Sequence, residues 1–314
     1  MRDTFVKHLC DMAQRDTDLY LLTGDLGFRL FDEFRERFSD RFLDMGIAEQ
    51  NMIGVAAGLA LSGKKVYCYS IIPFLVMRAY EQIRVDIAYH NLDVKLVGVG
   101  GGFTYGMEGF THFGLEDFAL MRSLPNMTVV VPADPVEARC VAELSATVAG
   151  PMYIRLGRTG DPVLHDATPP LEIGKAMILR EGVDASIFVT GSMAAVALSV
   201  ADRLEHTGIA ATVINMHTLK PLDVETIKST ASTRKIIISI EEHNISGGLG
   251  SAIGEVLLES HYHGLFKRFG ISEPLGTAMG DADFLRDTHG LTADNIFQQI
   301  FDMARKEKGK SYGN

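Results

Sequence analysis

Between Asp44 and Leu61 the sequence reads DMGIAEQNMIGVAAGLAL. A short apolar run ends where this stretch begins. The small residues within the stretch, such as Gly54 and Gly58, predict a helix that another backbone can approach closely. Glu49 falls in the first turn of this helix, where the helix dipole favours a carboxylate. The ordinary interpretation is a glutamate at a helix start, and the alternative is a carboxyl group with a chemical role.

Short apolar runs alternate with helical patterns on both sides of this stretch. After residue 70, apolar side chains recur at steps of 4, 3 and 4, which is the spacing of one helical face. The alternation predicts an α/β fold with a mostly parallel sheet and helices on both of its faces. In such sheets ligands bind beyond the carboxyl ends of the strands. The expected strands are Leu19–Thr23, Lys65–Ser70, Val94–Val99, Met127–Val131 and Met152–Leu156, and the helical face comprises Val76, Tyr80, Ile83 and Ile87.

Length and turn residues divide the chain into two domains. Its 314 residues are enough for two domains of typical size. The segment 158–174 is rich in Gly, Pro, Asp and Thr, which is typical of a linker, and the alternation restarts after it. We therefore expect an α/β domain over residues 1–165, a linker over 166–180, and a second, smaller α/β domain over 181–314.

Charge and cysteine content narrow the class of protein. Lys and Arg total 30 against 40 for Asp and Glu, which gives a net charge of −10. This negative charge argues against a nucleic-acid partner, because a protein that binds nucleic acid needs a positively charged surface. Single arginines or backbone amides can still bind a small anion. Three widely separated cysteines argue against a zinc or disulfide site and suit a cytoplasmic protein. The first residues do not resemble a secretory signal, and no membrane span is expected.

A glycine-rich loop follows the strand expected at Val94–Val99. It reads GMEGFTHFGLED from Gly106 to Asp117 and places His112 among glycines and carboxylates. A histidine there could transfer protons or hold a substrate hydroxyl near neutral pH, whereas a structural loop histidine would bind backbone groups. No second histidine stands at a ligand spacing, so no metal site is expected.

Two arginines, Arg155 and Arg158, lie at the end of the strand Met152–Leu156 and just after it. A strand-end arginine can bind a phosphate or another anion, and the alternative is a surface salt bridge. The later run from Ser246 to Gly254 is also rich in glycine, but it lacks the spacing of a dinucleotide-binding turn and has no P-loop lysine. That run indicates a tight packing turn.

Taken together, seven segments resemble the C-terminal section of the transketolase family of thiamine diphosphate enzymes. The segments are TGDLG (23–27), DMGIAEQNMIGVAAGLAL (44–61), YSIIPFLVMRAYEQIR (69–84), GFTH (109–112), MRSLPNMTVVVPAD (121–134), YIRLGR (153–158) and EEHNISGGLG (241–250). The resemblance covers the chain from residue 1 to near residue 258. It implies a thiamine-fold pyrimidine-binding domain, a smaller transketolase C-terminal domain, and transfer of a two-carbon ketol unit from a ketose donor to an aldose acceptor.

One feature of the family is missing from this chain. The family binds the cofactor diphosphate and Mg²⁺ on a further module marked by GDG followed by Asn, and no GDG triplet occurs in this sequence. The resemblance therefore implies one subunit of a split transketolase, with a separate N-terminal subunit that carries the GDG…N motif and most of the Mg²⁺ site. The dimeric habit of the family implies an α₂β₂ heterotetramer that acts on small sugars or sugar phosphates in the cytoplasm.

The resemblance also assigns residues to the cofactor. Glu49 matches the glutamate that bonds N1′ of the pyrimidine and favours its imino tautomer, so that the 4′-nitrogen can take the thiazolium C2 proton. Phe74 matches the aromatic residue that stacks on the pyrimidine, with Leu75 or Ile72 as alternative registers. The other positions matched near the cofactor are Asp25, Arg78 and Tyr80.

On the substrate side, His112 matches a family histidine that stabilises oxygen charge, and Arg155 matches an arginine that binds the substrate phosphate. The loop departs from the family pattern at Gly101, Glu108 and Phe110, where the family has a phosphate-contacting His, an Asp and a Pro. We expect Gly101 to leave room for a bulkier group. The donor or acceptor is therefore expected to differ from the usual pentose phosphates.

Two other functions share parts of this pattern. The β subunit of a 2-oxo-acid dehydrogenase has the same two modules and works with a separate α chain, but the RAYEQ (78–82) and GFTH (109–112) elements favour transketolase. The second alternative is a catalytically silent regulatory subunit. The retained Glu49 and His112 argue against it.

Overall fold

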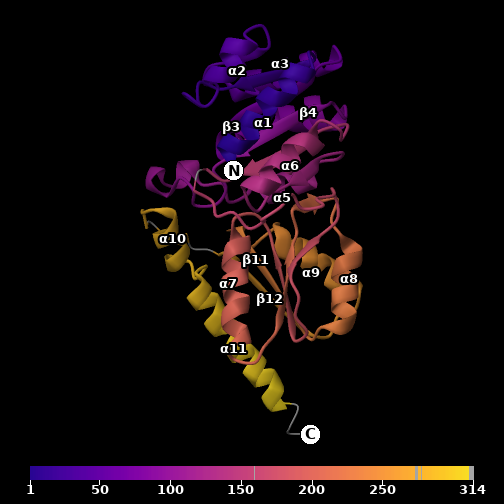
Figure 1. Cartoon of the computed structure of the whole chain (residues 1–314), viewed down its shortest axis with the longest axis vertical. Coiled ribbons are helices and arrows are strands. Elements are labelled where there is room, and N and C mark those ends of the chain that lie inside the picture. Colours follow the sequence, from indigo (N-terminus) through magenta and orange to yellow (C-terminus); the bar gives the residue numbers. More distant parts are fainter. Residues whose placement is uncertain (159, 273–274, 277, 311–314) are drawn as a thin grey trace.

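The computed structural model describes residues 1–158, 160–272, 275–276 and 278–310, with side chains described as far as residue 306. It shows two α/β domains that lie one above the other along the long axis, with the N-terminal domain at the top of Figure 1. This confirms the expected fold class. In the described part of the chain, no helix is both long and apolar enough to cross a membrane.

The N-terminal domain is built on a seven-stranded sheet in the order β10-β5-β6-β4-β3-β1-β2. The strands are β1 (Leu19–Thr23), β2 (Phe42–Asp44), β3 (Lys65–Ile71), β4 (Val94–Val99), β5 (Thr128–Val130), β6 (Met152–Leu156) and β10 (Thr218–Lys220). All neighbours are parallel except β10, which pairs antiparallel with β5. Because β10 comes from the second half of the chain, that half supplies an edge strand of the first sheet and joins the two domains.

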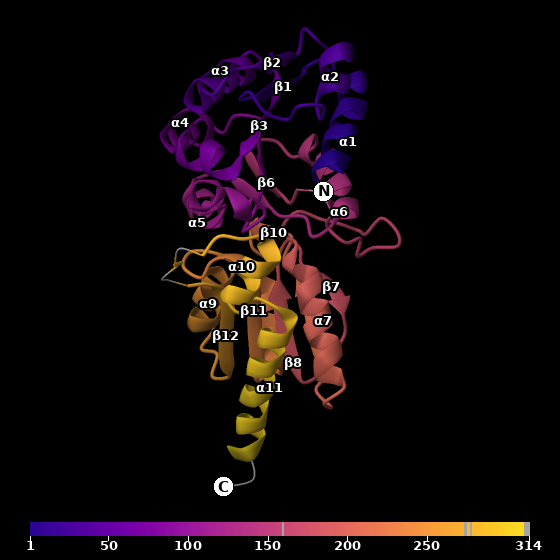
Figure 2. The same ribbon diagram turned by 90° about the vertical axis from the view of Figure 1, so that its left-hand side faces the viewer.

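Helices cover both faces of this sheet (Figure 2). One face carries α1 (Arg2–Arg15), α2 (Asp32–Arg37) and α6 (Pro135–Ser145), which share one apolar core. The other face carries α3 (Glu49–Leu61), η1 (Pro73–Met77), α4 (Tyr80–Gln82), η2 (Ile83–Tyr89) and α5 (Asp117–Ser123). The segments η1 and η2 are turns of π-helix. The expected helical face is confirmed, because Val76, Ile83 and Ile87 are buried in this second core.

The C-terminal domain has a five-stranded sheet in the order β12-β11-β8-β9-β7, which is parallel except for the edge strand β7. Its elements are β7 (Met177–Arg180), β8 (Ala185–Val189), α7 (Met193–Glu205), β9 (Ala211–Asn215), α8 (Val224–Thr233), β11 (Ile236–Asn244), α9 (Leu249–Glu259), β12 (Leu265–Ile271), α10 (Ala282–Thr288) and α11 (Ala293–Lys310). Helices α7 and α11 cover one face, and α8 and α9 cover the other. The last residues of the expected linker, 177–180, therefore belong to this sheet, where they form its edge and pair with β9.

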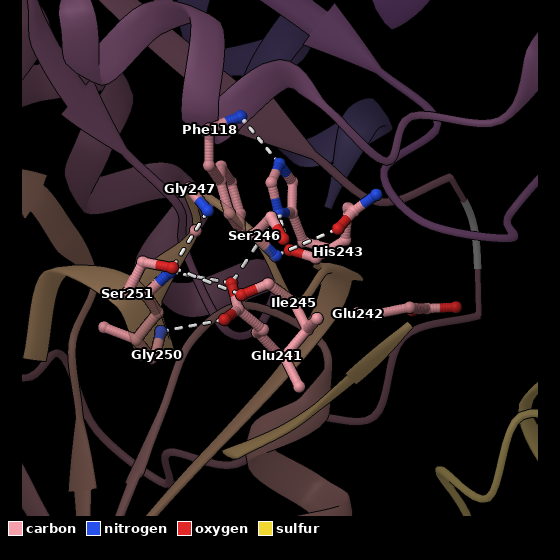
Figure 3. A network of polar contacts seen from close by, with 12 residues as sticks. Phe118, Glu241, Glu242, His243, Ile245, Ser246, Gly247, Gly250 and Ser251 are labelled. Atoms are coloured by element: carbon pink, nitrogen blue, oxygen red, sulfur yellow. Dashed lines mark hydrogen bonds and ion pairs between the residues drawn. The ribbon is translucent and has the colours of Figure 1, made fainter. Parts of the chain in front are cut away.

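The two domains meet at the carboxyl end of β11, where three consecutive polar residues are buried (Figure 3). Nε2 of His243 accepts a hydrogen bond of 3.2 Å from the backbone N–H of Phe118 in α5. Nδ1 of His243 donates to the carbonyl of Asn244 at 2.7 Å, and the imidazole stacks on the Phe118 ring with centroids 4.6 Å apart. One ring nitrogen accepts and the other donates, so the imidazole is neutral. Burial lowers the pKa of His243 to about 4.

Glu241 lies beside this histidine and holds the start of the next helix. Its carboxylate oxygens accept hydrogen bonds of 2.7 and 2.8 Å from the N–H groups of Leu249 and Gly250 in α9. A Cβ at Gly248 would lie 2.0 Å from Oε2 of Glu241, so the glycine run after β11 is the packing turn that the sequence predicts. Burial raises the pKa of Glu241 to about 7.

We predict that protonation of His243 weakens this junction as the pH falls. The folded-state pKa is depressed to about 4, so the stabilisation is present above the unfolded value of 6.5 and is lost as the pH falls toward 4. Between pH 7.5 and pH 5 the loss is about 2 kcal/mol. Glu241 acts in the opposite direction, because its pKa is raised to about 7 and its contribution is lost as the pH rises.

The measurement is therefore a difference between two proteins that share Glu241 and a neighbouring buried ion pair, in which Nε of Arg155 lies 3.1 Å from Oδ2 of Asp117. Urea unfolding of the wild type and of His243→Gln is compared at pH 7.5 and pH 5. We expect the gap in the free energy of unfolding to shrink by about 2 kcal/mol at the lower pH. A gap that does not change with pH would contradict the assignment.

Candidate active site

Five segments that follow strands meet at the carboxyl edge of the first sheet, and each carries one candidate residue. Asp25 follows β1, Glu49 follows β2 and Phe74 follows β3. His112 lies in the loop after β4, and Arg158 follows β6. Because these five strands are neighbours and run parallel, the loops that follow them lie side by side. This edge is the candidate active site.

Glu49 is a buried carboxylate at the start of α3, with only 1% of its surface exposed. Its Oε1 accepts a hydrogen bond of 3.1 Å from the hydroxyl of Ser70, at the end of β3. Its Oε2 lies 2.5 Å from Nη1 of Arg78. A Cβ at Gly24 would lie 3.3 Å from Oε1, so the glycine after β1 leaves space for the carboxyl group. The helix start, the hydroxyl and the guanidinium together stabilise a charge at this depth.

The Phe74 ring is linked to this carboxylate through Arg78, whose guanidinium carbon lies 4.7 Å from the ring centre. The ring is half-buried, whereas Ile72 and Leu75 are completely buried in the core, so Phe74 is the one of the three alternatives that faces the site. The imidazole of His112 meets the Phe74 ring edge-on, with centroids 5.1 Å apart. Nδ1 of His112 lies 2.9 Å from the hydroxyl of Thr111. The structure therefore brings an acid, an aromatic ring and an imidazole to one edge of the sheet.

The other two expected cofactor residues, Tyr80 and Asp25, have different surroundings. The hydroxyl of Tyr80 lies 2.8 Å from the hydroxyl of Ser123 and donates to the carbonyl of Leu120 at 3.3 Å, so this side chain points to α5. The helix therefore turns this hydroxyl toward a neighbouring helix, and a cofactor contact of Tyr80 stays a prediction. Asp25 is exposed at the edge of the site, in a left-handed backbone conformation with φ of 51°.

Two residues that shape this site are not singled out by the sequence. Oδ1 of Asp44 accepts hydrogen bonds of 2.9 and 3.0 Å from the backbone N–H groups of Asp25 and Gly46, and so holds the loops after β1 and β2 together. The other residue is Ser70, whose hydroxyl binds Glu49. Both Asp44 and Ser70 lie at the ends of strands just before candidate loops, and that position is the signal that could have found them.

Arg155, expected at the substrate phosphate, is instead buried between the domains with 6% of its surface exposed. Its Nη2 donates to the carbonyls of Gly114 and Glu242 at 2.6 and 3.0 Å. Its Nε lies 3.1 Å from Oδ2 of Asp117. This corrects the expectation, because β6 is an inner strand and both faces of a parallel sheet are covered. Arg158, just after the strand, is exposed and lies 5.3 Å over the ring of Tyr105.

Packing against Arg155 explains why position 101 is a glycine. A Cβ there would lie 2.5 Å from Nε of Arg155, so the residue must be glycine while that guanidinium is buried. The same holds on either side, where a Cβ at Gly100 would lie 2.1 Å from the Tyr105 ring and one at Gly102 would lie 2.4 Å from Glu242. The expectation that Gly101 leaves room for a bulkier substrate is therefore wrong.

A cluster of possible metal ligands lies away from this edge. Ligand atoms of Asp134, Glu137 and His165 are within 4.8 Å of one another. Both oxygens of Asp134 accept backbone N–H groups, and the oxygens of Glu137 accept the Ala133 N–H, the Asn215 amide and the imidazole of His165. These bonds tie the segment after β6 to α6 and to the second domain, so the cluster has a structural role.

We predict that Arg155 and Arg158 differ in their effect on stability. Arg155→Met leaves the completely buried Asp117 without its cation, which should lower the free energy of unfolding by about 3–5 kcal/mol. Arg158→Met is the matched control, because the side chain is exposed and should change stability by less than about 0.5 kcal/mol. Urea denaturation of the full chain measures both. Equal effects of the two substitutions would contradict the structural assignment.

Comparison with known proteins gives independent information on this fold. Residues 1–160 match the model of the transketolase pyrimidine-binding domain, and residues 174–296 match that of the transketolase C-terminal domain. A 6-deoxy-6-sulfo-D-fructose transketolase subunit from a Clostridium species is 37% identical over 308 residues, covering 98% of this chain and 95% of its own.

Two further relatives agree. One of the subunits of an apulose-4-phosphate transketolase from Actinobacillus succinogenes is 37% identical over 263 residues, or 84% of this chain and 85% of its own. A solved structure of a split-gene transketolase, an inactive β4 tetramer, superimposes with a TM-score of 0.87 at 37% identity and covers 96% of this chain and 97% of its own. These matches confirm the expectation that the chain is a transketolase-type transferase subunit. The chain belongs to the transketolase family and comprises the pyrimidine-binding and C-terminal domains of that family.

Proposed function

We propose that this chain is the subunit of a split transketolase that binds the pyrimidine of thiamine diphosphate and the substrate, and that it transfers a two-carbon ketol unit from a ketose to an aldose. The observation that supports this most directly is Glu49, a buried carboxylate at the carboxyl edge of the sheet whose partner Arg78 also contacts the Phe74 ring. The relatives that cover most of the chain are named as transketolase subunits.

The residues at this edge fit the aminopyrimidine group. When bound, thiamine diphosphate supplies the carbanion chemistry of ketol transfer, and the protein supplies binding and orientation. Glu49 holds a proton at N1′ of the pyrimidine, and Phe74 stacks on the ring. His112 holds an oxygen of the substrate by a hydrogen bond from its imidazole. The buried position of Glu49 keeps water from its carboxyl group.

The diphosphate and its Mg²⁺ are assigned to a partner subunit. This chain contains no GDG triplet, the signature of the module that binds both groups in the family. The relatives named as subunits support such a division of labour. We propose a separate N-terminal subunit with the GDG…N motif, an α₂β₂ assembly, and a cytoplasmic location that suits the three buried free cysteines.

The proposed function predicts activity only in the complex. With thiamine diphosphate and Mg²⁺, the purified chain alone should show no turnover, and addition of the N-terminal subunit should restore it. Glu49→Gln keeps the size of the side chain but cannot hold the proton, so the rate of the complex should fall at least ~10²-fold. Glu36→Gln, an exposed change on α2, is the control and should keep full activity. Turnover by the chain alone, or by the Glu49→Gln complex, would refute the proposal.

The substrate is proposed to carry an anionic group that Arg158 binds. The relatives act on a sulfonated and a phosphorylated sugar, as their names state, and Arg158 is the exposed arginine of the strand-end pair. A charge-assisted hydrogen bond contributes roughly 1.5–3 kcal/mol, so Arg158→Met should raise KM for an anionic ketose about tenfold or more. The KM for the matching uncharged sugar should not change. A substrate panel on the complex checks this, and equal shifts for both sugars would exclude Arg158 from the anion site.

A further inference from the structure

Arg78 makes two contacts in the candidate site with one planar group. Its Nη1 lies 2.5 Å from Oε2 of Glu49, and its guanidinium carbon lies 4.7 Å above the centre of the Phe74 ring. The guanidinium therefore lies on the aromatic face while it donates to the carboxylate. Among the described residues, it is the cation in contact with both side chains.

The chain places these groups by simple geometry. Phe74 lies in η1 and Arg78 follows that helical segment four residues later, so both side chains point from one face of the helix. Glu49 reaches the same point from the start of α3. The other carboxylate oxygen, Oε1, is already held by the hydroxyl of Ser70.

The proposed function assigns these same two contacts to the pyrimidine ring. A pyrimidine ring that bonds Glu49 through N1′ would use Oε2, because Ser70 already holds Oε1. A pyrimidine ring that stacks on Phe74 would use the face of Phe74 that the Arg78 guanidinium covers. A guanidinium and an aminopyrimidine are both flat and both carry N–H donors beside a π system. They cannot occupy one position on Phe74 and Glu49 together.

We propose that Arg78 is an internal stand-in for the pyrimidine of the cofactor, and that its side chain must move away before the cofactor binds. The inference rests on the proposed function. The stand-in offsets the cost of a buried charge, since Glu49 is 1% exposed and an unpaired carboxylate at that depth is strongly destabilising. Arg78 is 40% exposed, so its side chain can turn into solvent and leave the ring and the carboxylate to the incoming group.

This competition predicts opposite effects on stability and on affinity. Arg78→Met keeps an apolar side chain of similar length over Phe74 but removes the charge and the donors. The melting temperature of the full chain should fall, because Glu49 loses its cation. The affinity of the complex for thiamine diphosphate should rise about tenfold if the Arg78 side chain covers Glu49 and Phe74 in about 90% of the molecules. A merely structural arginine would lower both quantities.

The test uses the complex of this chain with the N-terminal subunit and Mg²⁺. Isothermal titration calorimetry gives Kd for thiamine diphosphate with the wild type, Arg78→Met and Arg78→Lys, and differential scanning calorimetry gives Tm of each full chain. Arg78→Lys keeps the charge without the planar group and should give an intermediate Kd, which tests the idea even if the methionine variant fails to fold. Arg35→Met, an exposed arginine of α2, is the matched control and should change neither value.

Each outcome decides the matter. Tighter binding with a lower Tm for Arg78→Met supports the stand-in role. Weaker binding would make Arg78 a direct cofactor contact, and unchanged binding would leave no competition; both overturn the inference while the proposed function stands. If the wild-type complex and the Arg35→Met complex bind no thiamine diphosphate, the proposed function itself fails.

Discussion

The buried ion pair of Arg155 and Asp117 fixes how the site and the two domains are arranged. Two charges taken out of water cost free energy that their attraction offsets only when the remaining hydrogen bonds are also made. The structure meets this condition at most of the polar atoms: Arg155 donates to the carbonyls of Gly114 and Glu242, and the hydroxyl of Tyr153 donates to Oδ2 of Asp117 at 2.7 Å. Oδ1 of Asp117 accepts no hydrogen bond from the described residues. These groups come from β6, α5, the loop after β4 and β11. One pair of charges therefore sets the relative position of segments from both domains.

The pair of Arg78 and Glu49 also offsets the cost of a buried carboxylate, but its arginine is freer to move. Glu49 is as deeply buried as Asp117, but the side chain of its partner Arg78 is 40% exposed, whereas that of Arg155 is 7% exposed. Arg155 is enclosed by carbonyl oxygens and an aromatic ring and cannot leave without breaking the junction. Arg78 reaches its carboxylate from the solvent side. The same chemical pair is thus a fixed support in one place and an exchangeable contact in the other.

The sequence predicts the framework better than the direction of side chains. The strands Leu19–Thr23, Val94–Val99 and Met152–Leu156 agree with the structure at both ends, because apolar runs bounded by turn residues leave little choice. The place of Arg155 at a strand end suggests a substrate contact, yet an inner strand of a parallel sheet is covered on both faces. Strand β10 is not predicted either, since three residues that pair with a distant strand carry no local signal.

The C-terminal domain contributes to the site without supplying any of the candidate residues. The glycine run after β4 packs against three side chains, and one of them, Glu242, belongs to β11. Glu242 accepts a hydrogen bond of 3.1 Å from the N–H of Phe103 and is paired with Arg286 of α10 at 2.9 and 3.0 Å. The loop that carries His112 is therefore held at its root by the second domain. Close packing fixes the position of this loop, and a fixed position suits an imidazole that must contact a substrate with defined geometry. The second domain therefore has a physical reason to accompany the first.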